Sequence, residues 1–126
     1  PRAGLARFRA LEKVYPREPE PLLGQIYVQG EILQQTAVAL EALERLVREH
    51  PDHIDGICCR AVYLARLKRD KEAVREAQRA ISLSNAPFTH YRVGCAYALL
   101  SEREPSYKQE ALRHLMQALE YYGGAD

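Results

Sequence analysis

A recurring pattern of apolar residues limits the folds available to this chain. In the segment 39–51, ALEALERLVREHP, an alanine is followed by apolar residues at +1, +4, +7 and +8 and by a helix breaker at +12. The segments 73–85 and 111–123 follow the same rule, and 4–16 is a weaker copy. The copies begin at 4, 39, 73 and 111, so the steps are 35, 34 and 38 residues. A period of this length is typical of helical repeat proteins.

The spacing within each copy predicts helices. Apolar residues at +1, +4 and +8 lie on one face of an α-helix, and the Pro, Asn or Gly at +12 stops it. The intervening segments 20–33, 53–67 and 86–100 are also apolar at helical spacing, and no segment alternates with period 2. We therefore expect an all-α chain of about seven helices, arranged as repeated helix-turn-helix pairs.

The pairs resemble the tetratricopeptide repeat. Its first-helix signature, a large apolar residue, a small one and then an aromatic, is matched by Leu23-Gly24-x-x-Tyr27 and by Val93-Gly94-x-x-Tyr97. The middle pair departs from it, with Arg60-Ala61-x-x-Leu64. The family's second-helix alanines are matched by Ala39, Ala73 and Ala111. The resemblance implies an α-α superhelix, a solenoid formed as one domain over 1–126. It comprises a second helix of a partial repeat (1–16) and the repeats 17–52, 53–86 and 87–123.

The turns inside the repeats differ in length. From the small first-helix residue to the second-helix alanine is 12 residues in the middle pair, but 15 from Gly24 to Ala39 and 17 from Gly94 to Ala111. GEILQQT and SEREPSY therefore contain insertions, which we expect to form loops. We also expect the small residues to admit the second helix closely, while Tyr27, Leu64 and Tyr97 fill the space one turn on.

The resemblance implies a non-enzymatic protein–protein interaction module. In that family the first helices line a concave groove that binds a peptide or a partner's helix. The family register places these groove residues here: Asp55, Cys58, Val62, Arg66, Phe88, Tyr91, Arg92, Cys95 and Leu99. Only Arg92 resembles the basic clamp that some members use for a partner's terminal carboxylate, so we expect an apolar or aromatic peptide. Phe88 and Tyr91 are candidate anchors; alternatively they cover a neighbouring helix or face a further repeat that is absent from this sequence.

A second function stays open. The combination of a Tyr-Arg-x-Gly-Cys-Ala-Tyr-Ala-Leu helix with an enlarged turn is similar to repeat arrays in large bacterial multidomain proteins, including some Ser/Thr protein kinases. The chain would then be a structural or regulatory spacer. Its opening without Met and its ending at YYGGAD suggest a piece of a longer protein. Uncovered apolar ends would then favour end-to-end self-association.

Charge argues against nucleic acid and membrane partners. Lys and Arg total 18 against 17 Asp and Glu, a net charge of +1, and no apolar run approaches the roughly 20 residues of a membrane span. The basic stretch 66–79 lacks interleaved aromatics, so we expect a solvated face of mixed ion pairs rather than a nucleic-acid site. Its same-sign neighbours four residues apart argue against an ordered ladder of ion pairs.

Titratable residues offer no enzyme signature. Cys58, Cys59 and Cys95 lack the spacing of a structural zinc site, and we expect them to fill space in a reduced, cytoplasmic protein. We expect His90 to be a hydrogen-bonded packing residue and His53 to be solvated. No cofactor, metal or catalytic residue is therefore predicted.

Overall fold

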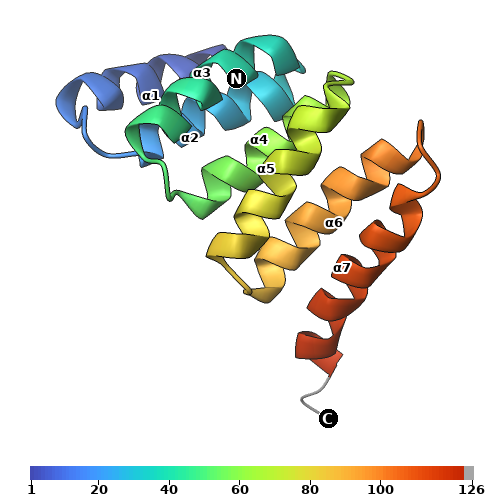
Figure 1. The fold of residues 1–126 in the computed structure, drawn as a ribbon. Helices are drawn as coiled ribbons and strands as arrows, with labels where there is room; N and C mark the ends of the chain where they lie inside the picture. The colour runs from blue at the N-terminus through green and yellow to red at the C-terminus, as the bar shows by residue number, and fades with distance from the viewer. Residues whose placement is uncertain (124–126) are drawn as a thin grey trace. The chain divides into compact units, whose positions relative to one another are not determined.

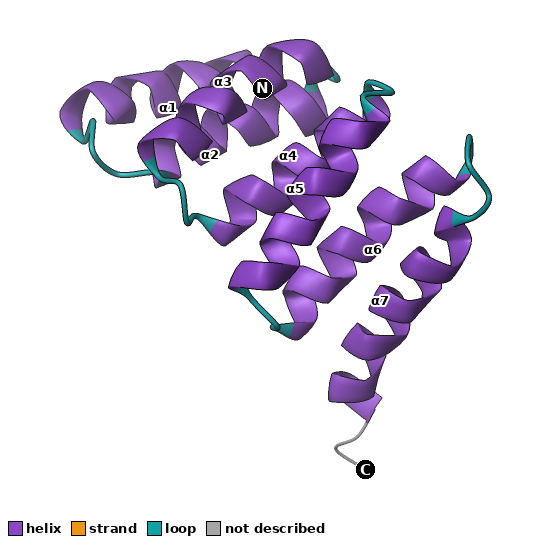
Figure 2. Ribbon diagram, in the orientation of Figure 1, coloured by secondary structure: helices purple, strands orange, loops and turns teal. Residues whose placement is uncertain are grey.

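The fold consists of helices throughout the part of the chain that is described. The computed structural model describes residues 1–123, and within them it contains seven α-helices, one π-helical segment and no strand (Figures 1 and 2). The helices are α1 (Arg2–Val14), α2 (Glu20–Tyr27), η1 (Val28–Ile32), α3 (Thr36–Glu49), α4 (Ile54–Arg66), α5 (Asp70–Leu83), α6 (Pro87–Ser101) and α7 (Tyr107–Gly123). The prediction of an all-α chain with about seven helices is confirmed. The superhelical stacking and the division into repeats stay predictions.

The helices end where the sequence provides breakers. Helix α1 ends two residues before Pro16, α3 two residues before Pro51, and α5 two residues before Asn85. Pro87 occupies the first position of α6, where its fixed φ suits a helix and its missing N–H leaves no hydrogen bond unmade. The local sequence therefore determines the boundaries as well as the existence of these helices.

The chain divides into two compact units, Pro1–Gly56 and Ile57–Asp126. In the first unit α2 packs against both α1 and α3 (blue to green in Figure 1). The core of this unit is formed by apolar side chains on the facing sides of the three helices. All are at most 8% exposed: Leu5, Leu22, Ile26, Leu40, Leu43 and Leu46. Burial of such side chains, at about 1.5–3 kcal/mol each, is the main term that holds the helices together.

The first of the two insertions is taken up by a wider helix. Residues Val28–Ile32 form a π-helical turn that continues α2, in which the Leu33 N–H donates to the Val28 carbonyl at 2.9 Å. Val28, Gln29 and Gly30 are buried. The prediction that GEILQQT simply forms a loop is therefore wrong in part, because the extra residues widen the helix before the chain turns at Gln34, where φ is 56°.

In the second unit, α6 and α7 lie side by side and pack against each other (Figure 1). Gly94 is the point of close approach: a Cβ there would lie 2.8 Å from the Leu115 side chain and 3.3 Å from the Ala111 carbonyl oxygen. The expected contact between a first-helix glycine and the second-helix alanine is thus confirmed in this pair. It determines which residues of α6 and α7 face each other.

Gly24 has a different neighbour. A Cβ at Gly24 would collide with the ring of Phe8 on α1, the helix before it, rather than with α3. Leu64 and Tyr97 are buried as expected, at 0% and 4% exposed, but Tyr27 is 59% exposed. The prediction that Tyr27 fills the space beside Gly24 is therefore wrong, because Phe8 already occupies it.

The second insertion does form a turn, over residues 102–106. Arg103 in this turn donates to both carboxylate oxygens of Asp70, at 2.6 and 3.2 Å, and to the Ala65 carbonyl at 2.9 Å. Asp70 begins α5 and Ala65 lies in the last turn of α4. One side chain thus links the turn after α6 to the turn between α4 and α5.

Candidate functional site

Three of the predicted groove residues lie together at the start of α6. Phe88 and Tyr91 are 53% and 50% exposed, and their rings are stacked with centroids 6.2 Å apart. The Arg92 guanidinium lies over the Phe88 ring, 5.6 Å from its centroid, a distance at which a cation is attracted to an aromatic face. Cys95 and Leu99 follow along the helix and are partly exposed. The structure therefore presents an aromatic surface where the sequence predicts one.

An apolar pocket lies between α6 and α7 beside this surface. It has a volume of about 380 Å³ and is lined by five apolar or aromatic residues, Phe88, Tyr91, Leu115, Ala118 and Leu119. We call it the α6–α7 pocket. A hollow of this kind has the composition of a site for an apolar or aromatic side chain.

The α7 wall of the pocket was not expected from the sequence, although a signal for it exists. Leu115, Ala118 and Leu119 are the +4, +7 and +8 positions of the last repeat copy. On α7 the +7 position, Ala118, is 4% exposed, whereas the +8 position, Leu119, is 66% exposed. The apolar stripe of the last described helix is thus partly core and partly surface.

The groove residues of the middle pair are placed differently. Cys58 is 1% exposed and Val62 is 9% exposed, so neither offers a surface to a ligand in this structure. Arg66 is exposed, with its guanidinium 5.2 Å from the centroid of the Tyr63 ring. Asp55 is exposed in the first turn of α4 and belongs to the first unit.

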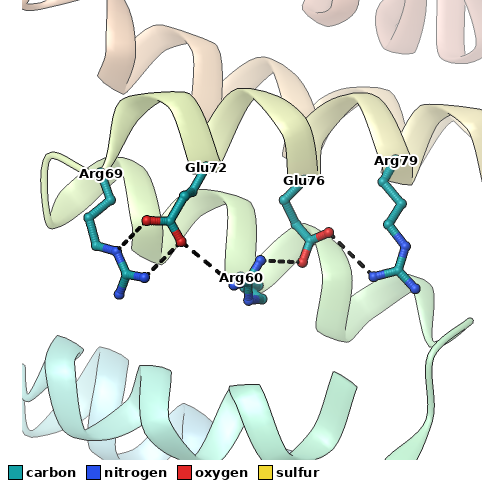
Figure 3. A network of polar contacts seen from close by, with 5 residues as sticks. All are labelled: Arg60, Arg69, Glu72, Glu76 and Arg79. Atoms are coloured by element: carbon teal, nitrogen blue, oxygen red, sulfur yellow. Dashed lines mark hydrogen bonds and ion pairs between the residues drawn. The ribbon is translucent and has the colours of Figure 1, made fainter. Parts of the chain in front are cut away.

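The basic stretch 66–79 is part of an ordered network of ion pairs. Arg60 of α4 lies between two glutamates of α5, 2.7 Å from Glu76 and 4.0 Å from Glu72 (Figure 3). Arg69 binds Glu72 with two nitrogens, at 2.7 and 3.0 Å, and Arg79 lies 3.5 Å from Glu76. Because Arg60 comes from the neighbouring helix, the like-charged glutamates are bridged.

This network corrects two expectations about α5. The face is not wholly solvated, since Glu76 is 4% exposed and contributes to the contact between α4 and α5. Glu72 and Glu76 are like-charged neighbours within α5, yet an ordered network of ion pairs forms. The bridging residue, Arg60, comes from α4, 16 residues before Glu76, and so lies outside the stretch 66–79 on which the expectation was based. Paired in this way, the charges of Glu72 and Glu76 serve the packing of two helices.

A second hollow beside α6 and α7 is polar. It has a volume of about 330 Å³, and its lining includes Asn85, His90, Tyr97, Glu110 and His114. His90 and His114 are each 3% exposed, and their Nδ1 atoms are 2.9 Å apart. His90 is thus a hydrogen-bonded packing residue, as predicted, whereas His114 was not expected as its partner.

The environment of the two histidines favours their neutral forms. Burial, and then the charge of Arg113, lowers the pKa of His90 below its ordinary value. The same two causes, in the same order, lower the pKa of His114; the charge of His90 lowers it slightly further, and only Glu110 opposes this by raising it. Tyr97 stacks on the His114 ring with centroids 5.7 Å apart.

The cysteines and the remaining titratable residues form no cluster of the kind that binds a metal in the part of the chain that is described. The three cysteines form no disulfide with one another, and among the described residues no group of three His, Cys, Asp or Glu could hold a metal ion. His53, expected to be solvated, is partly buried, and its Nδ1 accepts the Gly56 N–H at 3.0 Å at the start of α4. Within residues 1–123, no helix combines the length and apolar character needed to cross a bilayer.

Comparisons of the chain with protein-family models, with curated proteins and with solved structures find no match.

Proposed function

We propose that the chain is a tetratricopeptide-like repeat module that binds a partner protein without catalysing a reaction. In this proposal, an apolar or aromatic side chain of the partner docks in the α6–α7 pocket. The observation that carries the proposal is the pocket itself, whose aromatic rim is half exposed and whose α7 wall includes Leu119 at 66% exposed. Aromatic residues beside a concave apolar surface are typical of the residues that dominate protein interfaces.

The size and chemistry of the pocket indicate the kind of partner. At about 380 Å³ it accommodates one or two large side chains, so it serves as an anchor point for a peptide or a helix rather than as a complete interface. Phe88, Tyr91 and Leu119 provide flat, rigid or branched apolar contacts. Arg92 stands at the rim over the Phe88 ring, where it can pair with an acidic residue next to the docked side chain.

The exposure of these residues supports a binding role over a structural one. Exposed apolar residues cost little when scattered singly, but a contiguous patch on a folded protein marks an interaction surface. Tyr91 and Leu119 retain half or more of their surface to solvent, so neither is needed to fill the core. The proposal includes a cytoplasmic location, supported by the cysteines that form no disulfide with one another.

Peptide selection tests the proposal. The immobilised chain is panned against a displayed library of random peptides, and the affinity of the enriched peptides is measured by fluorescence anisotropy. We expect Tyr91→Ala and Leu119→Ala each to weaken binding by about tenfold or more, the cost of truncating an interface anchor. Leu83→Ala on α5 is the control, because Leu83 is also exposed, at 44%, but does not line the pocket.

The stability of the variants separates a lost contact with the peptide from a lost fold. Thermal melts of the three variants should agree with that of the unmodified chain within a few degrees, since each residue lies on the surface and is between 44% and 66% exposed. If no peptide is enriched, or if the pocket variants bind as tightly as the Leu83 variant, the proposed function is wrong.

One observation favours the alternative of a structural or regulatory spacer. Cys58 and Val62, which the family register places in the groove, are buried, so the middle pair presents little surface of its own there. A spacer fills its groove with its own side chains and needs no ligand. Failure to select any pocket-dependent peptide would support this second function.

A further inference from the structure

We propose that His90 and His114 form a proton-operated latch that holds α7 against α6 when both rings are neutral and loosens it when the pair takes up a proton. The two histidines face each other from different helices, and their Nδ1 atoms are 2.9 Å apart. Their rings are stacked with centroids 5.2 Å apart. The latch is separate from the α6–α7 pocket and does not depend on the proposed function.

The contacts of the pair are satisfied by one arrangement of protons. The Asn85 side-chain oxygen lies 2.7 Å from His90 Nε2 and can only accept, so His90 carries its proton on Nε2. The Nδ1 of a neutral His90 is then an acceptor, and His114 Nδ1–H donates to it. His114 Nε2 is left as an acceptor, and the Arg113 guanidinium lies 3.3 Å from it.

The reverse arrangement brings two donors together. If the Asn85 amide were turned to donate to His90, then His90 would donate through Nδ1, and His114 would have to carry its proton on Nε2. That N–H would point at Arg113, which has only donors. The direction of the chain of hydrogen bonds, from Arg113 through both rings to Asn85, follows from this conflict.

An added proton has no free acceptor in this arrangement. On His114 Nε2 it would face the Arg113 guanidinium, and on His90 Nδ1 it would face the Nδ1–H of His114. Protonation of both rings would bring two cations together at a separation of 2.9 Å between their nitrogens. Repulsion at such a distance in a buried site favours a larger separation of the two rings, and with it of the helices α6 and α7 that carry them.

The surroundings do little to offset this repulsion. Helix α7 contributes Glu110, but its carboxylate is 4.0 Å from His114 Nε2 and is already bound to Arg113 at 2.6 Å. Helix α6 contributes the Tyr97 ring, which stacks on His114. The residues of α5 that line the adjacent hollow are uncharged: Ala77, Gln78 and Ile81.

Protonation therefore weakens the folded state in a defined pH range. Burial and Arg113 lower the pKa of both histidines in the folded chain, whereas in the unfolded chain each titrates near 6.5. As the pH falls below that value the unfolded chain takes up protons that the folded chain resists, so stability declines. The latch is thus closed at neutral pH and strained at the mildly acidic pH at which histidine switches act.

Long-range ¹H–¹⁵N NMR spectra and hydrogen exchange on the unmodified chain test the latch. At about pH 7.5 we expect protons on His90 Nε2 and His114 Nδ1. Between about pH 7.5 and 5.5 we expect the first uptake of a proton by the pair to coincide with a loss of about tenfold or more in the exchange protection of α7 amides, corrected for intrinsic rates. Charged histidines with unchanged α7 protection would overturn the proposal, and so would the opposite tautomers.

A variant pair assigns the effect to these residues. His114→Gln removes one titrating ring, and we expect it to lose most of the acid-dependent change in α7 protection. His50→Gln in the first unit is the control and should retain the full change. Equal acid sensitivity in both variants would overturn the proposal, and if His114→Gln fails to fold, the NMR experiment on the unmodified chain decides alone.

Discussion

Replacing Gly94 by Ala tests the close packing of α6 on α7. In an open helix position the change stabilises by about 0.8–1 kcal/mol, because alanine has the higher helix propensity. At Gly94 the new Cβ would lie 2.8 Å from the Leu115 side chain and 3.3 Å from the Ala111 carbonyl oxygen, whereas carbon atoms pack best at about 3.5–4.0 Å. Overpacking of this kind costs about 1–3 kcal/mol, so we expect a net loss of about 1 kcal/mol.

Urea denaturation of two matched variants separates the two effects. Gly4→Ala on α1 is the control, because a Cβ there meets nothing within 4 Å, and it should stabilise the chain by about 0.5–1 kcal/mol. Leu115→Ala should remove most of the collision. In a chain that carries it, Gly94→Ala should therefore lower the free energy of unfolding by about 1–2 kcal/mol less than in the unmodified chain. Equal stabilisation at positions 4 and 94, or effects that simply add in the double variant, would refute the reasoning.

Two further predictions concern charged groups. Arg60→Ala should lower the free energy of unfolding by about 1.5–3 kcal/mol, measured by urea denaturation, because it removes the 2.7 Å partner of the buried Glu76. In a chain that already carries Glu76→Gln, Arg60→Ala should cost less than in the unmodified chain. An equal cost in both backgrounds would contradict the pairing. The Arg45 hydrogen bond is the main cause of the lowered pKa of Glu12, so the chain should lose stability as the pH falls from about 4.5 through that lowered pKa. In Glu12→Gln this acid-dependent loss should be smaller, and an unchanged profile in urea titrations would contradict the assignment.

The helices could be predicted because their determinants are local. The apolar stripe of each repeat copy lies within a few turns, and Pro16, Pro51 and Asn85 lie just beyond the helices that they terminate. The close contact at Gly94 was also predictable, since a glycine in a helix is costly and implies a close neighbour. These features need no knowledge of how distant helices meet.

Contacts between helices were harder to predict, because they depend on register. Gly94 of α6 lies opposite Ala111 of α7, and the two helices are antiparallel. His90, four residues before Gly94, therefore meets His114, three residues after Ala111. The sequence contains both histidines, but their pairing follows only from that register. The same applies to Arg60, whose role between two glutamates of α5 depends on how α4 lies against it.

The partial failures have physical causes as well. The first insertion could be accommodated by a loop or by a wider helical turn, and the buried residues Val28–Gly30 favoured the latter. Phe8 took the space beside Gly24 that the repeat pattern assigns to Tyr27. The pocket wall on α7 was missed because an apolar stripe looks the same in sequence whether or not another helix covers it.

The most direct test of the proposed function is to locate a bound peptide on the chain. Methyl-labelled chain is titrated with the tightest peptide from the displayed library, and the NMR shifts of Leu, Val and Ala methyl groups are followed. The proposal predicts that the largest changes occur at Leu115, Ala118 and Leu119, with Leu83 unaffected. Largest changes at the buried Val62, or on helices of the first unit, would contradict it.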